Sequence, residues 1–299
     1  MSVMPRPAHY GFAEHWLPRL VLAPSFLLVL IFLYGFIAWN GALSFTASRL
    51  LPNFEWAGLA QYEALFASER WWVAVQNLFI FGVLFIGGAM AVGIVLAILL
   101  DQKIRLEGAL RTIYLYPLAL SFIVTGTAWG WMLNPGLGLE KLVHDWGYAG
   151  FSFDWLVNPD RSIYTIVIAG VWQSSGFVMA LFLAGLRGID DAIIKAAQID
   201  GASLPRIYWR IILPAMRPVF FSTLMILAHI AIKSFDLVMA LTGGGPGFSS
   251  DLPATFMYQM AFTRGQMGLG AASAMMMLVT VSAIVVPYLY SELRRGRNV

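Results

Sequence analysis

The sequence predicts an all-α integral membrane protein with six transmembrane helices. Hydrophobic residues make up 59% of the 299 residues, charged residues make up only 12%, and the mean hydropathy is +0.73. Soluble domains carry about 25% charged residues, so the bilayer is the main solvent of this chain. Six apolar stretches are each long enough, at about 1.5 Å per helical residue, to cross about 30 Å of hydrocarbon.

These stretches define one transmembrane domain, 20–290, between two short tails, 1–19 and 291–299. The first stretch is longer than the roughly 7–15 apolar residues of a signal-peptide core, so we interpret it as a retained anchor. An even number of spans places both tails on the same side of the membrane. The predicted spans are Leu20–Trp39, Val75–Leu100, Ile113–Leu133, Ile163–Leu186, Val219–Ala240 and Ala271–Tyr290.

The basic residues indicate which side that is. The tails and the segments 101–112 and 187–218 hold 13 of the 19 Lys and Arg residues, whereas the three intervening connections hold five. Cytoplasmic segments carry the excess of Lys and Arg, so both termini are predicted to be cytoplasmic. The segment 187–218 is then cytoplasmic as well.

Composition excludes several kinds of chemistry. The absence of cysteine excludes disulfides and cysteine metal sites, and the four histidines lack H-x-x-x-H spacing, so we expect no bound metal. The net charge of +3 is explained by topology, and we expect no nucleic-acid partner. The chain has no G-x-x-x-x-G-K-[ST] loop, so we expect it to bind no ATP in that way and to carry no catalytic residue.

The cytoplasmic segment 190–218 is predicted to form two short helices joined at a glycine. Asp190 and Asp191 supply acceptors for the first helix, whose body is 193–199. Gly201 can adopt the left-handed conformation that ends a helix. Ser203 can cap the second helix, which Pro214 then disturbs. Such an elbow presents a rigid surface to a cytosolic partner.

Polar residues inside the spans are functional candidates, because they are costly there. Gln173 and Ser174 lie near the middle of the fourth span, and His229 lies at a similar depth in the fifth. Lys233 and Asp236 follow at i+4 and i+7, on the same helical face as His229. One interpretation is a Lys233–Asp236 pair that fixes helix packing. The other is the polar lining of a substrate pathway, faced by Gln173.

The elbow resembles a known motif. Ala196-Ala197, Asp200-Gly201-Ala202 and Ile212-Leu213-Pro214 resemble the EAA loop of ABC importer permeases, E-A-A-x-x-x-G followed by I-x-L-P. The resemblance implies that the first short helix is a coupling helix that docks on an ATPase subunit. Lys195 stands where the family usually has Glu. The implied coupling residues are Lys195, Ala196, Ala197, Asp200, Gly201 and Ala202.

A second motif follows the fifth span. The run GGGPG at 243–247 cannot continue a helix and predicts an irregular turn at the outer face. With the preceding Phe235-Asp236, its residues Gly244, Gly245 and Pro246 resemble the F-D-x-x-x-x-L-T-x-G-G-P segment of carbohydrate importer permeases. The two motifs indicate the maltose/glycerol-phosphate-type branch, on the side of the MalF-like permease, and the resemblance covers about 20–295.

This resemblance implies a type I, MetI-like permease domain in a bacterial inner membrane. The implied partners are a second permease, two ATPase subunits that bind ATP and magnesium, and a periplasmic sugar-binding protein. The implied function is to form half of a sugar pathway and to couple ATPase closure to alternating access.

Three alternatives belong to other classes. A secondary, ion-coupled transporter of a small polar solute typically has internal repeats and more spans, and we find no convincing repeat. A membrane enzyme needs several His, Asp or Glu side chains at matched depth, and only His229 qualifies. A scaffold would not need polar residues that face each other at mid-depth. Copurification with an ATPase subunit discriminates all three.

Overall fold

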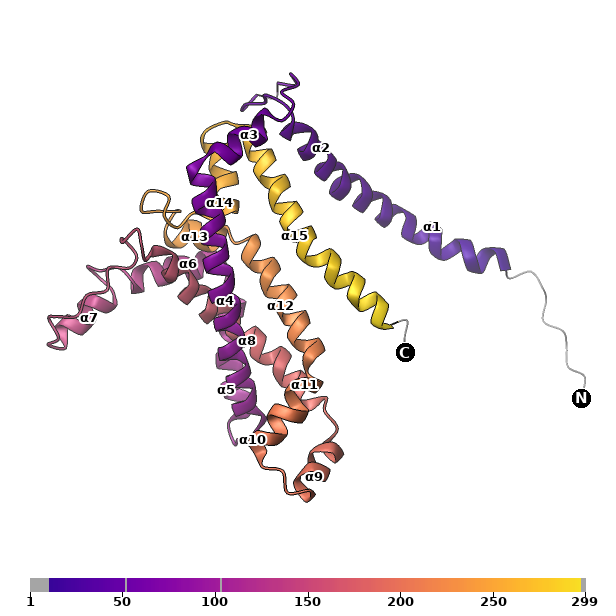
Figure 1. Ribbon diagram of the computed structural model, residues 1–299, viewed down its shortest axis with the longest axis vertical. Coiled ribbons are helices and arrows are strands. Elements are labelled where there is room, and N and C mark those ends of the chain that lie inside the picture. The colour runs from indigo at the N-terminus through magenta and orange to yellow at the C-terminus, as the bar shows by residue number, and fades with distance from the viewer. Residues whose placement is uncertain (1–10, 52, 103, 297–299) are drawn as a thin grey trace, which may run out of the picture.

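The computed structural model describes residues 11–51, 53–102 and 104–296, and the regular secondary structure in this part of the chain is helical apart from one isolated β-bridge between Thr46 and Trp56. Figure 1 places α3 and α14 at one end of the molecule and α9 and α10 at the other. The α-helices are α1 Gly11–Val29, α2 Gly35–Ser44, α3 Ala60–Ala67, α4 Glu69–Asp101, α5 Glu107–Leu115, α6 Phe122–Met132, α7 Leu139–Asp145, α8 Ser162–Arg187, α9 Asp191–Ile199, α10 Leu204–Ile207, α11 Leu213–Ala215, α12 Arg217–Ile232, α13 Asp236–Leu241, α14 Pro253–Tyr258 and α15 Met267–Gly296. Short 3₁₀ or π turns occupy Leu30–Tyr34, Tyr116–Ala119, Tyr208–Ile212 and Gln259–Thr263.

Six spans are present when bent helices are counted as single crossings. Four helices in the described residues are individually long and apolar enough to cross a bilayer: Trp16–Ser44, Glu69–Asp101, Ser162–Arg187 and Met267–Tyr288. Two further pairs of helices reach that length only with a bend. Helix α1 begins inside the predicted tail 1–19, and α15 continues into the predicted tail 291–299; residues 1–10 and 297–299 lie outside the described part.

The centre of the bundle is the packing of α4 against α8. Their backbones approach closely at Gly93, where an added Cβ would come within 2.5 Å of Val178 and 2.9 Å of the Met179 amide. Small residues permit such approaches in lipid, where dispersion replaces the hydrophobic effect as the driving force between helices. Phe81, Phe85, Phe182 and other apolar side chains form one continuous buried cluster along this contact.

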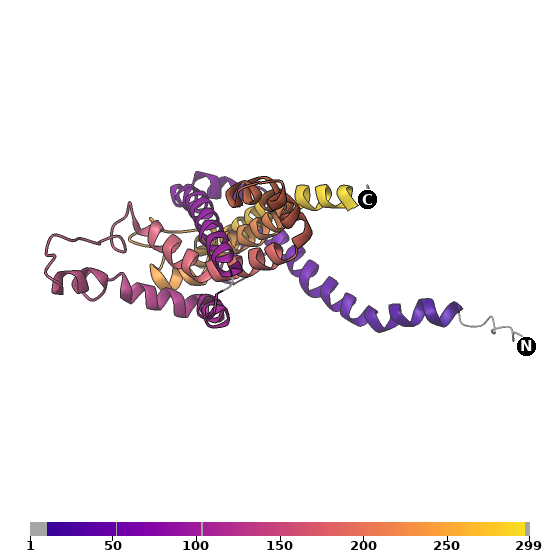
Figure 2. The same cartoon turned by 90° about the horizontal axis from the view of Figure 1, so that it is seen from below.

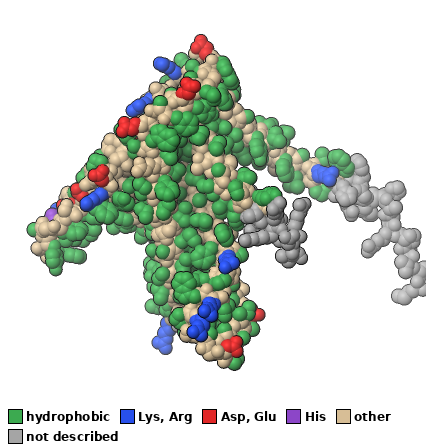
Figure 3. Space-filling view, viewed as in Figure 1, with side chains coloured by type: hydrophobic (Ala, Val, Ile, Leu, Met, Phe, Trp, Pro, Cys, Tyr) green, Lys and Arg blue, Asp and Glu red, His purple; other side chains and the backbone are tan. Residues whose placement is uncertain are grey.

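The first span lies apart from this centre. None of the side chains in its apolar window is buried against the rest of the chain, although α2 packs on α15. Figures 1 and 2 show α1 extending away from the bundle. In Figure 3 the charged side chains visible on this face lie along the upper edge and the arm at the left and at the lower end, with one basic side chain on the arm at the right; the middle of the bundle is mainly apolar. This distribution suits a chain surrounded by hydrocarbon at mid-height.

The third span is broken, so the prediction of one helix over 113–133 is wrong. The helices on either side of Leu120 and Ser121 meet at an angle of 99°. Ser121 caps α6 by accepting a hydrogen bond from the Val124 amide at 3.3 Å. Serine at this position supplies the acceptor that a new helix N-terminus needs, and Pro117 removes a donor just before it.

The fifth span also differs from the prediction of a helix over 219–240. Helix α12 ends at Ile232, Lys233 is its C-cap residue, and α13 starts only at Asp236. His229, Lys233 and Asp236 therefore do not share one continuous helical face. In addition, no ion pair joins Lys233 to Asp236 in the described structure.

Candidate functional site

The elbow, 190–218, begins with a side-chain cap. Asp190 has extended backbone angles, and its Oδ1 accepts a hydrogen bond from the Ala192 amide at 2.9 Å. The carboxylate also faces the positive end of the helix dipole, where a negative charge is stabilising. The predicted acceptor role of Asp190 is therefore confirmed.

Helix α9 ends at a left-handed glycine. Gly201 has a φ of +77°, as predicted, and an added Cβ there would contact nothing within 4 Å. The Ala202 amide donates to the Ala197 carbonyl at 3.0 Å, and the Gly201 amide donates to the Gln198 carbonyl at 3.0 Å. This pair of bonds is a Schellman motif, which satisfies carbonyls that the helix end leaves free. Glycine is required here by conformation and not by space.

The two faces of α9 differ in what covers them. Ile194 and Ala197 pack against the main apolar cluster and attach the helix to the bundle. The opposite face exposes Ile193, Ala196 and Ile199, with Ile199 86% exposed. An exposed apolar stripe on a helix outside the membrane-spanning segments is typical of a surface that a partner protein covers. Beside this stripe Lys195 is exposed, as are Asp200 and Gly201, whereas Ala202 is half-buried.

Two helix breaks meet inside the bundle. Lys233, Ser234 and Asp236, from the break between α12 and α13, line a small cavity of about 70 Å³. Phe122, the first residue of α6, lines the same cavity, together with Phe235, Ile230 and Leu237. Lys233 and Asp236 are exposed within this chain. Broken helices at membrane depth are expected only where they line a cavity or are covered by protein.

The other predicted pathway residues lie elsewhere. Gln173 is buried in α8, and its Nε2 donates to the Leu120 carbonyl at 2.8 Å. That carbonyl belongs to the break before α6, so the hydrogen bond from Gln173 stabilises the break. Ser174 is buried beside it, while His229 is exposed on α12 and is not among the residues that line the cavity.

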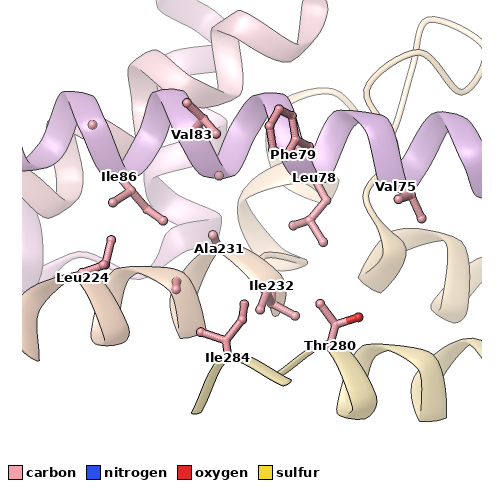
Figure 4. A pocket seen from close by; sticks show the side chains of 13 residues that line it. Val75, Leu78, Phe79, Val83, Ile86, Leu224, Ala231, Ile232, Thr280 and Ile284 are labelled. Carbon is pink, nitrogen blue, oxygen red and sulfur yellow. The ribbon is translucent and has the colours of Figure 1, made fainter. Parts of the chain in front are cut away.

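The structure contains a much larger groove, but its chemistry is different. About 570 Å³ lies between α4, α12 and α15, lined almost wholly by apolar side chains such as Leu78, Phe79, Leu224 and Ile284 (Figure 4). Thr280 is the one side chain in the lining that carries a hydroxyl. A sugar would leave most of its hydroxyls unpaired there, so this groove is not the polar site.

The loop after α13, which the sequence predicts to lie at the outer face, is held by a buried polar network. The Asp251 side chain is fully buried and accepts a hydrogen bond from Arg70 Nε of α4 at 2.5 Å and from Thr255 Oγ1 at 3.1 Å. Arg70 also donates to the Gln259 side chain. Asn77 Nδ2 donates to the carbonyls of Asp251, at 3.0 Å, and of Ser249. Burial raises the pKa of Asp251 even though Arg70 acts to lower it, so the cost of desolvating the carboxylate outweighs the effect of its cation on the pKa.

The glycine motif fits against this network. Gly243, Gly244 and Gly247 all have positive φ, which confirms the predicted irregular turn. A Cβ on Gly244 would lie 2.2 Å from Asp251 Oδ1, so this position is limited both by conformation and by space. Ser250 Oγ donates to the Gly245 carbonyl at 2.7 Å and closes the loop before Pro246.

Comparison with known proteins connects these features to a family. The sequence pattern of the family described as "binding-protein-dependent transport system inner membrane component" matches residues 89–295. The chain belongs to this family. The match includes the elbow, both helix breaks and the outer glycine loop.

Individual relatives of this permease cover nearly its whole length. A probable ABC transporter permease protein of Pyrococcus horikoshii is 39% identical over 91% of this chain and 94% of its own. The xylose/arabinose import permease protein XacH of Haloferax volcanii is 37% identical over 91% of this chain and 86% of its own.

Solved structures show the same fold. A chain of a bacterial ABC transporter that imports the acidic polysaccharide alginate superimposes with a TM-score of 0.82 at 22% identity, covering 94% of the permease and 96% of that chain. A chain of a bacterial alginate ABC transporter in complex with an alginate pentasaccharide-bound periplasmic protein gives a TM-score of 0.81 at 21% identity, covering 94% and 95%. The predicted ABC importer permease fold is confirmed.

Sequence reasoning missed the residues that hold the outer loop: Arg70, Asn77, Asp251 and Gln259. One signal was available, because Asp251 is the only acidic residue between 241 and 270. An isolated acid next to an apolar helix indicates a buried partner. Its partner on α4 could not be identified from the sequence, because Arg70 is 181 residues away.

Proposed function

We propose that this permease is a transmembrane subunit of an ATP-binding-cassette importer for a sugar. The observation that carries the proposal is family membership over 89–295, which includes the elbow, both helix breaks and the glycine loop. The sugar class is supported by the name of a relative that imports xylose and arabinose, and by the carbohydrate-type motif at 235–246.

The proposed partners bind at opposite ends of the molecule. An ATPase subunit would cover the exposed apolar stripe of α9 at the cytoplasmic end, and ATP and magnesium would bind to that subunit. A periplasmic sugar-binding protein would dock at the outer end, near the glycine loop; one of the similar solved structures is a complex with a periplasmic protein that holds an alginate pentasaccharide. A second permease would complete the pathway, and a second ATPase would serve it.

We place sugar passage beside the cavity lined by Lys233, Ser234 and Asp236. An ammonium, a hydroxyl and a carboxylate can together donate to and accept from sugar hydroxyls. No ion pair joins Lys233 to Asp236 in the described structure. Both side chains would therefore be available to bind a substrate. Gln173 and Ser174 would contribute by holding the α6 break in place, and His229 would face the pathway at a neighbouring depth. The chain performs no chemistry on the sugar.

The proposed location is the bacterial inner membrane, with both termini cytoplasmic. The support is the excess of Lys and Arg on the side of the elbow. A reporter that works only in the cytosol, fused after Val299, should be active. The same reporter inserted within 134–162 should be inactive, and activity there would contradict this topology.

Reconstitution tests the function directly. The permease, its partner permease, the ATPase subunits and the binding protein are placed in liposomes, and uptake of labelled sugar is followed. Uptake should require internal ATP and the binding protein. Uptake driven by an ion gradient without ATP would instead identify the secondary transporter considered from the sequence.

A further inference from the structure

Arg187 joins three helices at the cytoplasmic end of the bundle. It is the last residue of α8, and its Nη2 donates to Glu107 Oε1, at the start of α5, at 2.5 Å. Its Nε lies 3.8 Å from Asp101 Oδ1, at the end of α4. The three side chains are 30–44% exposed. The Arg187 guanidinium therefore links the end of α8, just before the elbow, to both ends of the short α4–α5 connection.

The other side of the elbow reaches the same connection. Tyr208 follows α10 and packs against the main apolar cluster. Burial raises the pKa of its phenol, and the negative charge of the nearby Asp101 carboxylate raises it further. The elbow helix α9 thus leaves the bundle beside Arg187 and returns beside Tyr208. Both points are electrostatically coupled to Asp101: Arg187 through an ion pair at 3.8 Å, and Tyr208 through the effect of the carboxylate on its pKa.

Apolar packing lies beneath these polar contacts. Leu100 of α4, Leu186 of α8, and Ile207 and Ile212 in the second half of the elbow are all buried in the main cluster. Each of these residues is within one position, or one helical turn, of a member of the polar group. The end of α4, the end of α8 and the second half of the elbow are therefore packed together beneath the polar contacts.

We propose that Arg187, held by Asp101 and Glu107, is a positioning residue for transport: it transmits displacement of α9 to α4 and α8. This inference rests on the proposed function. Without the ion pairs, α9 would still meet a partner through Ile193 and Ile199, but its movement would be absorbed at the base of the elbow. The ATPase would then continue to hydrolyse ATP, but less sugar would be transported per ATP hydrolysed.

The expected size of the effect follows from the exposure of the group. Half-exposed ion pairs are individually weak, and a guanidinium shared by two carboxylates is stronger than a single pair. We expect loss of Arg187 to lower the sugar moved per ATP hydrolysed about fivefold, equivalent to about 1 kcal/mol of coupling.

The experiment measures uptake and ATP hydrolysis in the same liposomes. Arg187→Gln should assemble with the ATPase at wild-type yield and show the fivefold lower ratio. Arg187→Lys keeps the positive charge but loses the planar guanidinium that can bind two carboxylates. Its ratio should therefore lie between those of the wild type and Arg187→Gln. Arg111→Gln is the matched control, because Arg111 is exposed on α5 with no ion pair in the described structure. Its ratio should equal that of the wild type.

A distance measurement tests the same inference without transport. The chain has no cysteine, so spin labels can be placed at Ile104→Cys in the α4–α5 connection and at Ile199→Cys on α9, both exposed. Arg187→Gln should broaden the distance distribution between the labels, and Arg111→Gln should leave it narrow.

An unchanged ratio of sugar moved to ATP hydrolysed, together with an unchanged distance distribution, would overturn the inference. A parallel loss of uptake and hydrolysis caused by lost ATPase would overturn it as well. Absence of ATP-driven uptake in the wild type would instead overturn the proposed function, while the label distances would still report on Arg187.

Discussion

Arg70 at the start of α4 and Asp251 in the outer loop form a buried ion pair, with Nε 2.5 Å from Oδ2, although 181 residues separate them. The Asp251 side chain is fully buried, whereas that of Arg70 is 14% exposed. The pair ties the loop that carries the glycine motif to the longest helix of the bundle.

Removal of Arg70 should therefore destabilise the permease strongly. Arg70→Met leaves a buried carboxylate without its cation, a change that costs about 3–5 kcal/mol in comparable buried pairs. Arg70→Met with Asp251→Asn should recover most of this loss, because the amide carries no charge. The measurement is thermal unfolding in detergent. Arg161→Met, at an exposed outer position, is the control.

The instability of Arg70→Met should depend on pH. Burial already raises the pKa of Asp251 with Arg70 present, and removal of the cation raises it further. A carboxyl group with a raised native pKa stabilises the fold below its unfolded pKa, and this stability is lost as pH rises through the native value. The deficit of Arg70→Met relative to wild type should thus shrink from pH 7 to pH 5. A deficit that is constant over this range would show that the carboxylate is not its cause.

Gly244 and Gly247 form a matched pair for the outer loop. Both have positive φ, so alanine at either position costs roughly 1–2 kcal/mol in backbone strain. Only at Gly244 does the new Cβ collide with Asp251, whereas at Gly247 nothing lies within 4 Å. Gly244→Ala should lower the unfolding temperature clearly more than Gly247→Ala. Equal shifts would mean that the loop moves away from Asp251 without cost.

Gly201→Val should separate folding from coupling. The left-handed residue loses about 1–2 kcal/mol on gaining a side chain, which is small for a helix bundle in lipid. The direction in which the chain leaves α9 would change, however, and with it every contact of the exposed stripe. We expect normal membrane levels, less copurified ATPase and loss of sugar uptake.

The control for Gly201 is Gly188→Ala. Gly188 has ordinary helical angles, and an added Cβ would meet its nearest neighbour at 3.4 Å. This variant should keep uptake. Wild-type uptake and wild-type ATPase stimulation in Gly201→Val would show that the elbow does not couple hydrolysis to transport.

Lys233→Met tests the cavity between the two breaks. If Lys233 binds substrate, the complex should assemble normally and uptake should fall about tenfold, the value of one charge-assisted hydrogen bond. If a packing pair with Asp236 forms in the assembled complex, Lys233→Met should reduce the yield of complex, and adding Asp236→Leu should restore it. The measurements are complex yield and initial uptake rate. Unchanged uptake in both variants would dismiss both interpretations.

Local signals in the sequence determined much of this protein. The apolar stretches gave six crossings, since a helix in hydrocarbon must satisfy its own backbone and needs about 20 apolar residues to do so. Asp190 and Gly201 gave the ends of α9, because caps depend on the residue itself and its nearest neighbours. The GGGPG run gave the turn for the same reason.

Only the tertiary structure decided where the spans break and what the polar residues meet. The break at Leu120 is possible because Gln173, more than 50 residues away, donates to the carbonyl that the break frees. The end of α12 at Ile232 separated Lys233 from the helical face on which an unbroken pattern would place it. Asp251 can be buried because Arg70 reaches it from α4. Each of these features depends on a partner that is distant in sequence. Hydropathy and local spacing describe only neighbouring residues, so they cannot predict such a partner.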